Sequence, residues 1–335
     1  MDLSSLGEFG LIARIRRAES RRRHRRPSVI LGIGDDAAVF RPAPGFDLLL
    51  TTDVLLEGVH FRREVAPLRD IGYKSVAVNV SDIAAMGGIP RAYLASIAIP
   101  PDLSAKDVDE IYRGMREGAR DGAVDLVGGN ACASKWIYLN LTLVGEVERG
   151  GGITRAGARA GDLLFVTGTL GDSAAGCHLL RSAGRKERGT SGSSFLVRRH
   201  LRPTARWQEG RLLRHLASAM IDLSDGLSSD LGHLCDESGV GAVVGASLLP
   251  LSRAMRAFCR RYRKDPLRYA LDGGEDYELL FSVPARRTKR LYDLIRRGAL
   301  RATAIGKILP SREGRWLSRP DGRVPLQAAG YDHFR

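Results

Sequence analysis

The chain has 335 residues and a net charge of +14, and 44% of its residues are hydrophobic. This length is enough for two domains of ordinary size, and the hydrophobic content excludes a largely disordered chain. No segment reaches the roughly 18 apolar residues that span a bilayer, and no signal-peptide core precedes the basic N-terminal run, so we expect a cytoplasmic protein without a membrane anchor. The four cysteines lie far apart without a CxxC pair, which favours buried thiols over zinc ligands or disulfides.

The first half of the chain alternates between helical patterns and short apolar stretches. Apolar positions recur at helical spacing in residues 6–18, residues 70–86 are a candidate for an amphipathic helix, and a further helix is expected over residues 104–122. Ser104 is typical of a helix N-cap. Apolar stretches bounded by Gly, Pro or Asp predict strands at residues 29–33, 37–40, 48–52, 92–99, 125–127 and 137–147. We expect the strands at 37–40 and 48–52 to pair across the Pro/Gly turn between them.

Three consecutive glycines at 150–152 are the best candidate for a domain boundary. They predict an N-terminal domain over residues 1–148 and a C-terminal domain over residues 149–335. In the second half we expect strands at 162–167 and 219–223, helices at 173–182, 205–217 and 228–238, and a Gly/Ser-rich loop at 183–194. Mixed strands and helices of this kind predict an α/β (mixed α+β) fold with two domains.

Six short turns place acidic or amide side chains beside Gly, Ser or Thr. They lie at residues 34–36, 51–53, 81–82, 128–130, 222–226 and 273–276. A single acidic turn is usually a helix cap or an Asx-turn. Six of them in a basic chain indicate a cation site, because Mg²⁺ prefers oxygen ligands and is usually held by one or two carboxylates together with phosphate oxygens and water.

The absence of two common ATP-site motifs excludes two classes of phosphate site. The chain has no G-x-x-x-x-G-K-[ST] loop and no HRD/DFG pair, so it contains neither a P-loop nor a protein-kinase ATP site. The segment 168–173 (GTLGDS) opens a helix, and its backbone N–H groups would suit a phosphate, although the same sequence also suits an ordinary turn.

Several runs, taken in order along nearly the whole chain, resemble the thiamine-monophosphate kinase family. They are GIGDDAAVF (32–40), TTDVLLEGVHF (51–61), KSVAVNVSDIAAMGGIP (74–90), VTGTLGDSAAG (166–176), VRRHLRPTAR (197–206), IDLSDGLSSDLGHL (221–234), LDGGEDYELLF (271–281) and GYDHF (330–334). This family belongs with aminoimidazole-ribonucleotide synthetase and selenophosphate synthetase. The resemblance implies a PurM-like fold, in which two N-terminal domains pair in a homodimer to form a β-barrel. It also implies direct transfer of a phosphoryl group from ATP to thiamine monophosphate, with no catalytic residue that forms a covalent intermediate.

The resemblance also implies roles for individual residues. The residues that would hold several Mg²⁺ ions are Asp36, Thr51, Thr52, Asp53, Asp82, Asn130, Asp222 and Asp225. Those that would contact ATP are Tyr112, Gly129, Asn130, Arg155 and Ser224. His60, Glu275 and Tyr331 would contact the thiamine part, where a ring cation favours a carboxylate and an aromatic face.

One position departs from the family pattern. The family usually has Gly-Gly-Asp where this chain has Gly128, Gly129 and Asn130. Asn keeps a carbonyl oxygen for a metal ion but loses the negative charge. The departure therefore concerns one Mg²⁺ site and leaves the other carboxylates in place.

Two alternatives remain, one within the same superfamily and one from a different functional class. Another enzyme of the same superfamily would act on a different small substrate, but residues 1–60 lack the reactive Cys and the Lys that are typical of selenophosphate synthetases. A basic nucleic-acid-binding protein would use the Arg-rich run at 21–26 as a phosphate-backbone arm. No RNP-type or zinc-finger motif accompanies that run, which favours a solvated helix end instead.

Overall fold

The computed structural model describes residues 14, 17, 29–31, 39–182 and 191–331. The predicted helix at 6–18 and the Arg-rich run lie almost wholly outside these residues, and Asp36 lies outside them as well. The chain divides into two compact units. Unit 1 comprises residues 1–83 and 88–150, and unit 2 comprises residues 84–87 and 151–335.

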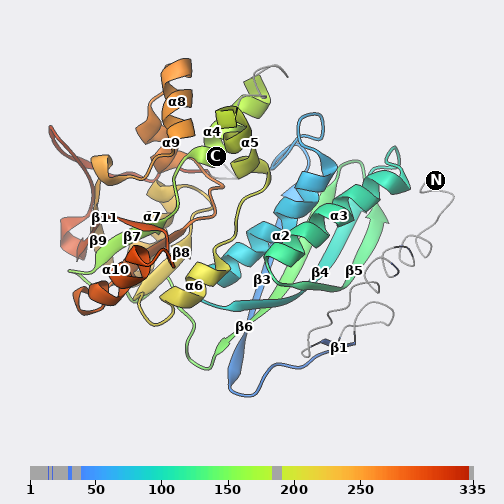
Figure 1. Cartoon of the computed structure of the whole chain (residues 1–335), viewed down its shortest axis with the longest axis horizontal. Coiled ribbons are helices and arrows are strands. Elements are labelled where there is room, and N and C mark those ends of the chain that lie inside the picture. The colour runs from blue at the N-terminus through green and yellow to red at the C-terminus, as the bar shows by residue number, and fades with distance from the viewer. Residues whose placement is uncertain (1–13, 15–16, 18–28, 32–38, 183–190, 332–335) are drawn as a thin grey trace. The chain divides into compact units, whose positions relative to one another are not determined.

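Unit 1 is a sheet covered on one face by two helices (Figure 1). Its described strands form a four-stranded sheet in the order β3-β6-β4-β5, and β1 pairs with β2 separately. The elements are β1 (Val29–Leu31), β2 (Val39–Phe40), β3 (Phe46–Leu56), α2 (Leu68–Ala85), β4 (Ile89–Ile99), α3 (Ala105–Asp121), β5 (Asp125–Ala133) and β6 (Tyr138–Glu148). The predicted pairing of 37–40 with 48–52 is wrong, because β2 pairs with β1 and β3 pairs along its whole length with β6.

Glycines at the contact between α2 and α3 let the two helices of unit 1 pack closely. Ser104 caps α3 in a capping box with Asp107, as its sequence predicts. A Cβ at Gly114 would lie 1.7 Å from the carbonyl oxygen of Arg69, and one at Gly72 would lie 2.0 Å from that of Ile111. Only glycine at these positions lets the backbones of α2 and α3 approach so closely.

Unit 2 is built around a larger sheet. Its described strands form a seven-stranded sheet in the order β13-β12-β9-β11-β7-β10-β8. The strands are β7 (Leu163–Thr167), β8 (Ala219–Asp222), β9 (Val240–Gly245), β10 (Leu279–Val283), β11 (Ala302–Pro310), β12 (Arg315–Arg319) and β13 (Gly322–Pro325). The helices are α4 (Asp172–Ser182), α5 (Ser191–Leu201), α6 (Trp207–Leu213), α7 (Leu227–Ser238), α8 (Arg253–Tyr262), α9 (Pro266–Asp272) and α10 (Thr288–Arg296). Residues 191–194 begin α5, so the predicted loop at 183–194 is wrong at that end.

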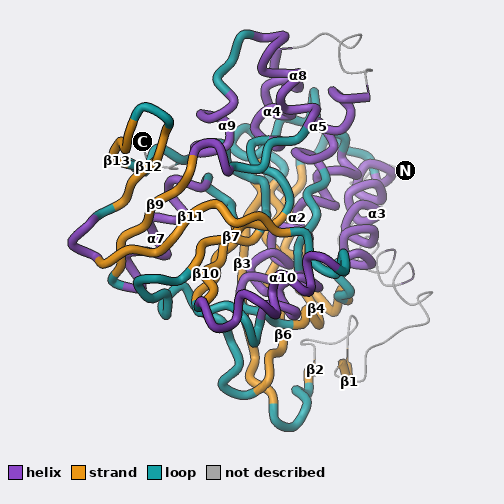
Figure 2. Tube along the Cα trace, turned by 60° about the vertical axis from the view of Figure 1, so that its left-hand side comes forward, coloured by secondary structure: helices purple, strands orange, loops and turns teal. Residues whose placement is uncertain are grey.

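Alternate residues of β7 point to two separate cores. Leu164 and Val166 pack with Leu231 of α7, whereas Phe165 packs with Phe281 and with Leu291 of α10. The period-two pattern of a strand buried on both faces accounts for this division. A third cluster joins α4, α5 and α8, which the tube view shows gathered together with α9 (Figure 2).

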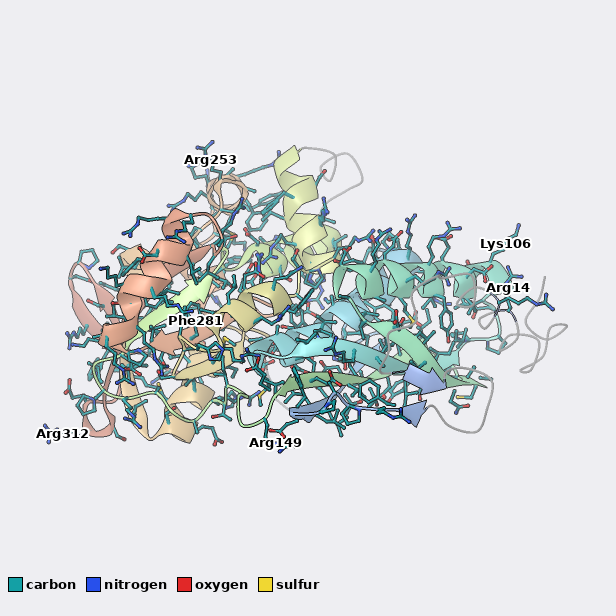
Figure 3. All side chains as sticks on the ribbon, turned by 60° about the horizontal axis from the view of Figure 1, so that its bottom comes forward. Arg14, Lys106, Arg149, Arg253, Phe281 and Arg312 are labelled. Atoms are coloured by element: carbon teal, nitrogen blue, oxygen red, sulfur yellow. The ribbon has the colours of Figure 1, made fainter. Side chains whose placement is uncertain are left out.

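The charged side chains lie mostly outside these cores. Phe281 lies within unit 2, whereas Arg253 and Arg312 project from its surface (Figure 3). None of the helices in the described segments is long and apolar enough to cross a membrane. Cys235 and Cys259 are buried free thiols, as predicted, but Cys132 is exposed on β5 and Cys177 is partly exposed.

Candidate active site

The predicted ligands on β3 divide between the two faces of the unit 1 sheet. Thr51 and Asp53 alternate with Thr52 and lie on the same side as the buried Leu55, facing the helices. The Thr51 hydroxyl donates a hydrogen bond to the carboxylate of Asp82 on α2. Thr51, Asp53 and Asp82 therefore belong to the helix-covered face.

Asn79 supports this group from one turn before Asp82. Its Oδ1 accepts a hydrogen bond from the backbone N–H of Asp53 at 3.1 Å, and its Nδ2 donates to the carbonyl of Ser75 at 2.9 Å. An amide that is fully buried and bonded on both sides fixes the local position of β3 against α2. Sequence reasoning missed Asn79, although its spacing of three residues from Asp82 on a helix signals a shared face.

Thr52 and Asn130 belong to the open face of the same sheet. The Thr52 hydroxyl donates to the carbonyl of Leu141 at 3.1 Å, and it accepts from Thr142 at 3.3 Å. Asn130 is exposed on β5 beside Ser96 of β4. The preceding Gly129 fits closely, because a Cβ there would lie 2.0 Å from the carbonyl oxygen of Ala95.

His60 is held by a reciprocal pair of hydrogen bonds after β3. The N–H of Leu56 donates to His60 Nδ1 at 3.1 Å, and the N–H of His60 donates to the carbonyl of Leu56 at 2.9 Å. Because Nδ1 accepts a hydrogen bond, the neutral ring carries its proton on Nε2. In this tautomer Nε2–H is the hydrogen-bond donor of the ring. Tyr112, a predicted ATP contact, lies on α3 with only 5% of its surface exposed.

Asp222 and Asp225 lie at the end of β8 and in the turn before α7. Sequence reasoning missed a third carboxylate there, Asp230, which accepts hydrogen bonds from the N–H groups of Asp225 at 3.2 Å and Gly226 at 3.0 Å. Burial, together with the charges of Asp222 and Asp225, raises the pKa of Asp230 to about 8. Carboxylates that disfavour each other's ionisation in this way suit a position beside a cation.

The donor sets fit Mg²⁺ in the form that it usually takes in proteins. In the described segments, no three His, Cys, Asp or Glu side chains gather into one metal-binding group. The acids instead lie in smaller sets. Asp82 bonds to Thr51 near Asp53 in unit 1, and in unit 2 Asp222 and Asp225 affect the pKa of Asp230 without the three carboxylates converging on one point. One or two carboxylates completed by phosphate oxygens and water are the usual arrangement for this ion.

Four predicted residues from three segments that are far apart in the sequence meet at the turn after β8. The N–H of Glu275 donates to the carbonyl of Ser224 at 2.7 Å, and the N–H of Tyr331 donates to the carbonyl of Asp225 at 3.1 Å. Tyr331 is 53% exposed and Glu275 is partly exposed, so both side chains remain accessible. The structure thus joins one predicted ATP contact, one predicted metal ligand and two predicted substrate contacts in a single assembly.

Arg155 lies at the surface of unit 2. Its side chain is exposed, and its carbonyl accepts a hydrogen bond from Ser238 Oγ at 2.8 Å. The same hydroxyl accepts from the N–H groups of Gly157 and Ala158, at 3.1 Å each. These bonds fix the backbone at 155–158 and leave the guanidinium accessible to a phosphate.

The segment 168–173, whose N–H groups would suit a phosphate, instead binds a carboxylate of the protein itself. The N–H groups of Gly171 and Ser173 donate to the carboxylate of Asp276 at 2.5 and 3.0 Å. The positive end of α4 attracts an anion, as the helix dipole requires, but this anion is a buried side chain. Burial raises the pKa of Asp276 to about 7, against the opposing effect of Arg199 and of these two N–H donors.

Comparisons with known proteins identify the family of the chain. The family description "AIR synthase related protein, N-terminal domain" matches residues 34–147, and "AIR synthase related protein, C-terminal domain" matches residues 159–316. The thiamine-monophosphate kinase of Aquifex aeolicus is 41% identical over 335 residues, covering 100% of both chains. The chain belongs to the thiamine-monophosphate kinase family.

Two solved structures extend this likeness to the fold. The crystal structure of thiamine-monophosphate kinase from Stenotrophomonas maltophilia is 37% identical, with a TM-score of 0.82, and covers 92% of this chain and 95% of its own. The structure described as "AaThiL complexed with AMPPCP and TMP" is 40% identical, with a TM-score of 0.79, and covers 100% of this chain and 99% of its own. This thiamine-monophosphate kinase family member therefore has the mixed α/β, two-domain fold predicted for it.

Proposed function

We propose that the chain transfers the terminal phosphoryl group of ATP to thiamine monophosphate and releases thiamine diphosphate. The observation that carries this proposal is the joining of Ser224, Asp225, Glu275 and Tyr331 at one turn of a family member. Thiamine-monophosphate kinases match this chain from end to end, and one solved relative was captured with AMPPCP, an ATP analogue, and TMP.

The chain's own residues would act by positioning and by binding charge. Arg155 would form forked hydrogen bonds to ATP phosphate, with Tyr112, Gly129 and Ser224 as further ATP contacts. The carboxylate of Glu275 and the ring of Tyr331 would face the thiazolium cation of the substrate. His60 would be a further substrate contact, with Nε2–H as its donor. No covalent intermediate with the enzyme is required, since phosphoryl transfer is catalysed mainly by orientation and charge stabilisation.

Mg²⁺ would be bound by the oxygen ligands of both units. The proposed ligands are Asp36, Thr51, Thr52, Asp53, Asp82, Asn130, Asp222 and Asp225. When bound, the ions would neutralise the negative charge of the phosphates.

A second copy of the chain would cover the open face of the unit 1 sheet. This face exposes Leu48 at 45%, Leu50 at 70% and Leu94 at 39%, on the side opposite to α2 and α3. Adjacent exposed leucines on a sheet face are typical of an interface, and closure of two such sheets would form the proposed barrel. Sedimentation of Leu50→Lys should show monomers with little activity, and an active monomer would contradict the homodimer.

One assay tests the main proposal. Purified protein is incubated with ATP, Mg²⁺ and thiamine monophosphate, and thiamine diphosphate is measured directly by chromatography. We expect formation of the diphosphate that stops when EDTA is added. A folded protein that forms none would contradict the proposal, and turnover of ATP with an aminoimidazole substrate instead would favour another activity of the superfamily.

A further inference from the structure

The turn that carries Glu275 has a strained backbone. Glu275 and Tyr277 have φ angles of 65° and 51°, in the left-handed region that residues with a Cβ rarely occupy. Such a conformation costs of the order of 1 kcal/mol or more per residue, so the surrounding structure must enforce it. The enforcing contacts identify residues that determine the direction of the Glu275 side chain.

One set of contacts holds Glu278, at the end of this turn, in a buried network of ion pairs. Glu278 is fully buried and accepts hydrogen bonds from Arg199 Nη2 at 2.9 Å and from Arg206 Nε and Nη2 at 2.7 and 2.6 Å. Thr167 Oγ1 donates to the same carboxylate at 2.6 Å. Burial alone would raise the pKa of Glu278, but the two guanidinium groups outweigh this and hold the pKa below its ordinary value. Glu278 is therefore a fixed anion.

A second set of contacts holds Asp276 and Tyr277, in the middle of the turn. Arg199 Nη2 also donates to the backbone carbonyl of Asp276 at 3.1 Å, so one guanidinium spans residues 276 and 278. The carboxylate of Asp276 is anchored to Gly171 and Ser173 at the start of α4. The N–H of Tyr277 donates to the carbonyl of Leu223 at 2.9 Å. The backbone between Glu275 and Glu278 is thus fixed on both sides.

The third contact reaches Glu275 itself. His200 Nδ1 lies 3.2 Å from Glu275 Oε2 and 3.1 Å from Ser173 Oγ, and the ring is only 6% exposed. A carboxylate only accepts hydrogen bonds, so a donor at Nδ1 is what this contact requires of the ring, and the Ser173 hydroxyl can accept from the same atom. Arg199 and His200 are neighbours in the last turn of α5, and Arg206 follows in the loop before α6.

We propose that the segment 199–206 is a clamp that sets the direction of the Glu275 carboxylate toward the thiamine part of the substrate. His200 is the positioning residue for the carboxylate, and Arg199 and Arg206 hold the turn through Glu278. This gives a role to the VRRHLRPTAR run, to which the proposed phosphoryl transfer assigns none. The inference rests on the proposed function, because that function makes Glu275 a substrate contact.

Paired substitutions at His200 separate positioning from simple packing. His200→Asn keeps a donor near the position of Nδ1, whereas His200→Leu removes it. We expect His200→Leu to raise the KM for thiamine monophosphate about tenfold and to leave the KM for ATP within about twofold, because only one substrate loses an oriented partner. His200→Asn should restore most of the loss. Equal changes in both KM values, or the same loss in both variants, would overturn the clamp.

A double substitution tests whether His200 acts through Glu275. In a Glu275→Gln background, His200→Leu should add little to the KM for thiamine monophosphate, since coupled residues give non-additive effects. Additive effects would show that His200 acts by another route and would overturn its assignment.

The role of Arg206 in the clamp can be tested without measuring enzymatic activity. Arg206→Lys keeps the charge but loses the fork to Glu278, and Arg198→Lys, an exposed position on α5, is the matched control. We expect the amides of Glu275 and Tyr277 to exchange hydrogen at least about tenfold faster in Arg206→Lys than in the control. Unchanged exchange would overturn the clamp. If the wild-type protein forms no thiamine diphosphate, the proposed function fails, while the exchange result still decides whether the clamp holds the turn.

Discussion

Around β3 in unit 1, the predicted ligands Thr51, Thr52 and Asp53 are consecutive residues of a regular strand and therefore face alternate sides of the sheet. Short polar side chains such as those of Asn79 and Thr142 bond to this segment. In unit 2, Glu275 instead lies on a strained turn, and the fully buried Glu278 at its end is held by the largely buried charges of Arg199 on α5 and Arg206 in the loop after it. A regular strand places its side chains by its own geometry, whereas a strained turn needs external contacts to persist. Substitutions should therefore act mainly on catalysis in the first region and on both stability and substrate orientation in the second.

The largest effect on catalysis is expected from Asp53→Asn in unit 1. The hydrogen bond to Asn79 uses the backbone N–H of Asp53, so the substitution should leave the fold intact while removing a proposed cation ligand. We expect the rate of thiamine diphosphate formation to fall by about 10³-fold with little change in Tm. Asp47→Asn on the same strand is the control. A rate within tenfold of the wild type would show that Asp53 holds no essential ion.

Glu278→Gln tests whether a substitution in the second region, in unit 2, lowers the stability of the protein. The substitution leaves Arg199 and Arg206 partly buried without their anionic partner, which should lower the free energy of unfolding by about 3–5 kcal/mol. Urea denaturation measures this value. Glu209→Gln, which removes the partly exposed partner of Arg206 at 3.2 Å, should cost far less. Equal losses of unfolding free energy in the two variants would contradict the proposed dependence of the unit 2 turn on its buried charges.

His60 offers a finer test of how unit 1 positions a side chain. The N–H of Leu56 fixes the neutral ring with its proton on Nε2, and glutamine places an amide near that atom whereas asparagine does not. We expect His60→Gln to keep most of the affinity for thiamine monophosphate and His60→Asn to raise its KM about tenfold. Steady-state kinetics on the two variants measures the difference, and the reverse order would contradict the assigned tautomer.

Asn130→Asp should have the smallest effect. The residue is exposed in the single chain, and the Mg²⁺ ion proposed to bind there would compensate the added charge of a carboxylate. We expect turnover to rise modestly, or the Mg²⁺ concentration for half-maximal rate to fall by about threefold, because a charged ligand binds the ion more tightly than an amide. A titration of activity with Mg²⁺ measures this. A loss of activity would show that the site has adapted around Asn130.

The local features of the sequence predict much of the regular structure. The helices expected at residues 70–86 and 104–122 correspond to α2 and α3, and Ser104 caps α3 as expected. The expectation that the first is amphipathic is wrong, because α2 is buried on nearly all sides. The strands at 92–99 and 162–167 correspond to β4 and β7. These features depend on neighbours a few positions apart, so a single segment contains the information that specifies them.

The sequence by itself determined the acidic turns, the regular elements and, through long ordered motifs, the kinase family. Only the tertiary structure decided that β3 pairs with β6, that Asp276 fills the end of α4, and that Asp230 joins Asp222 and Asp225. It also decided that Arg199 and Arg206, more than 70 residues before Glu278, would neutralise that buried carboxylate. The physical reason is that pairing across sheets and compensation of buried charge depend on distance in space, which local periodicity does not encode.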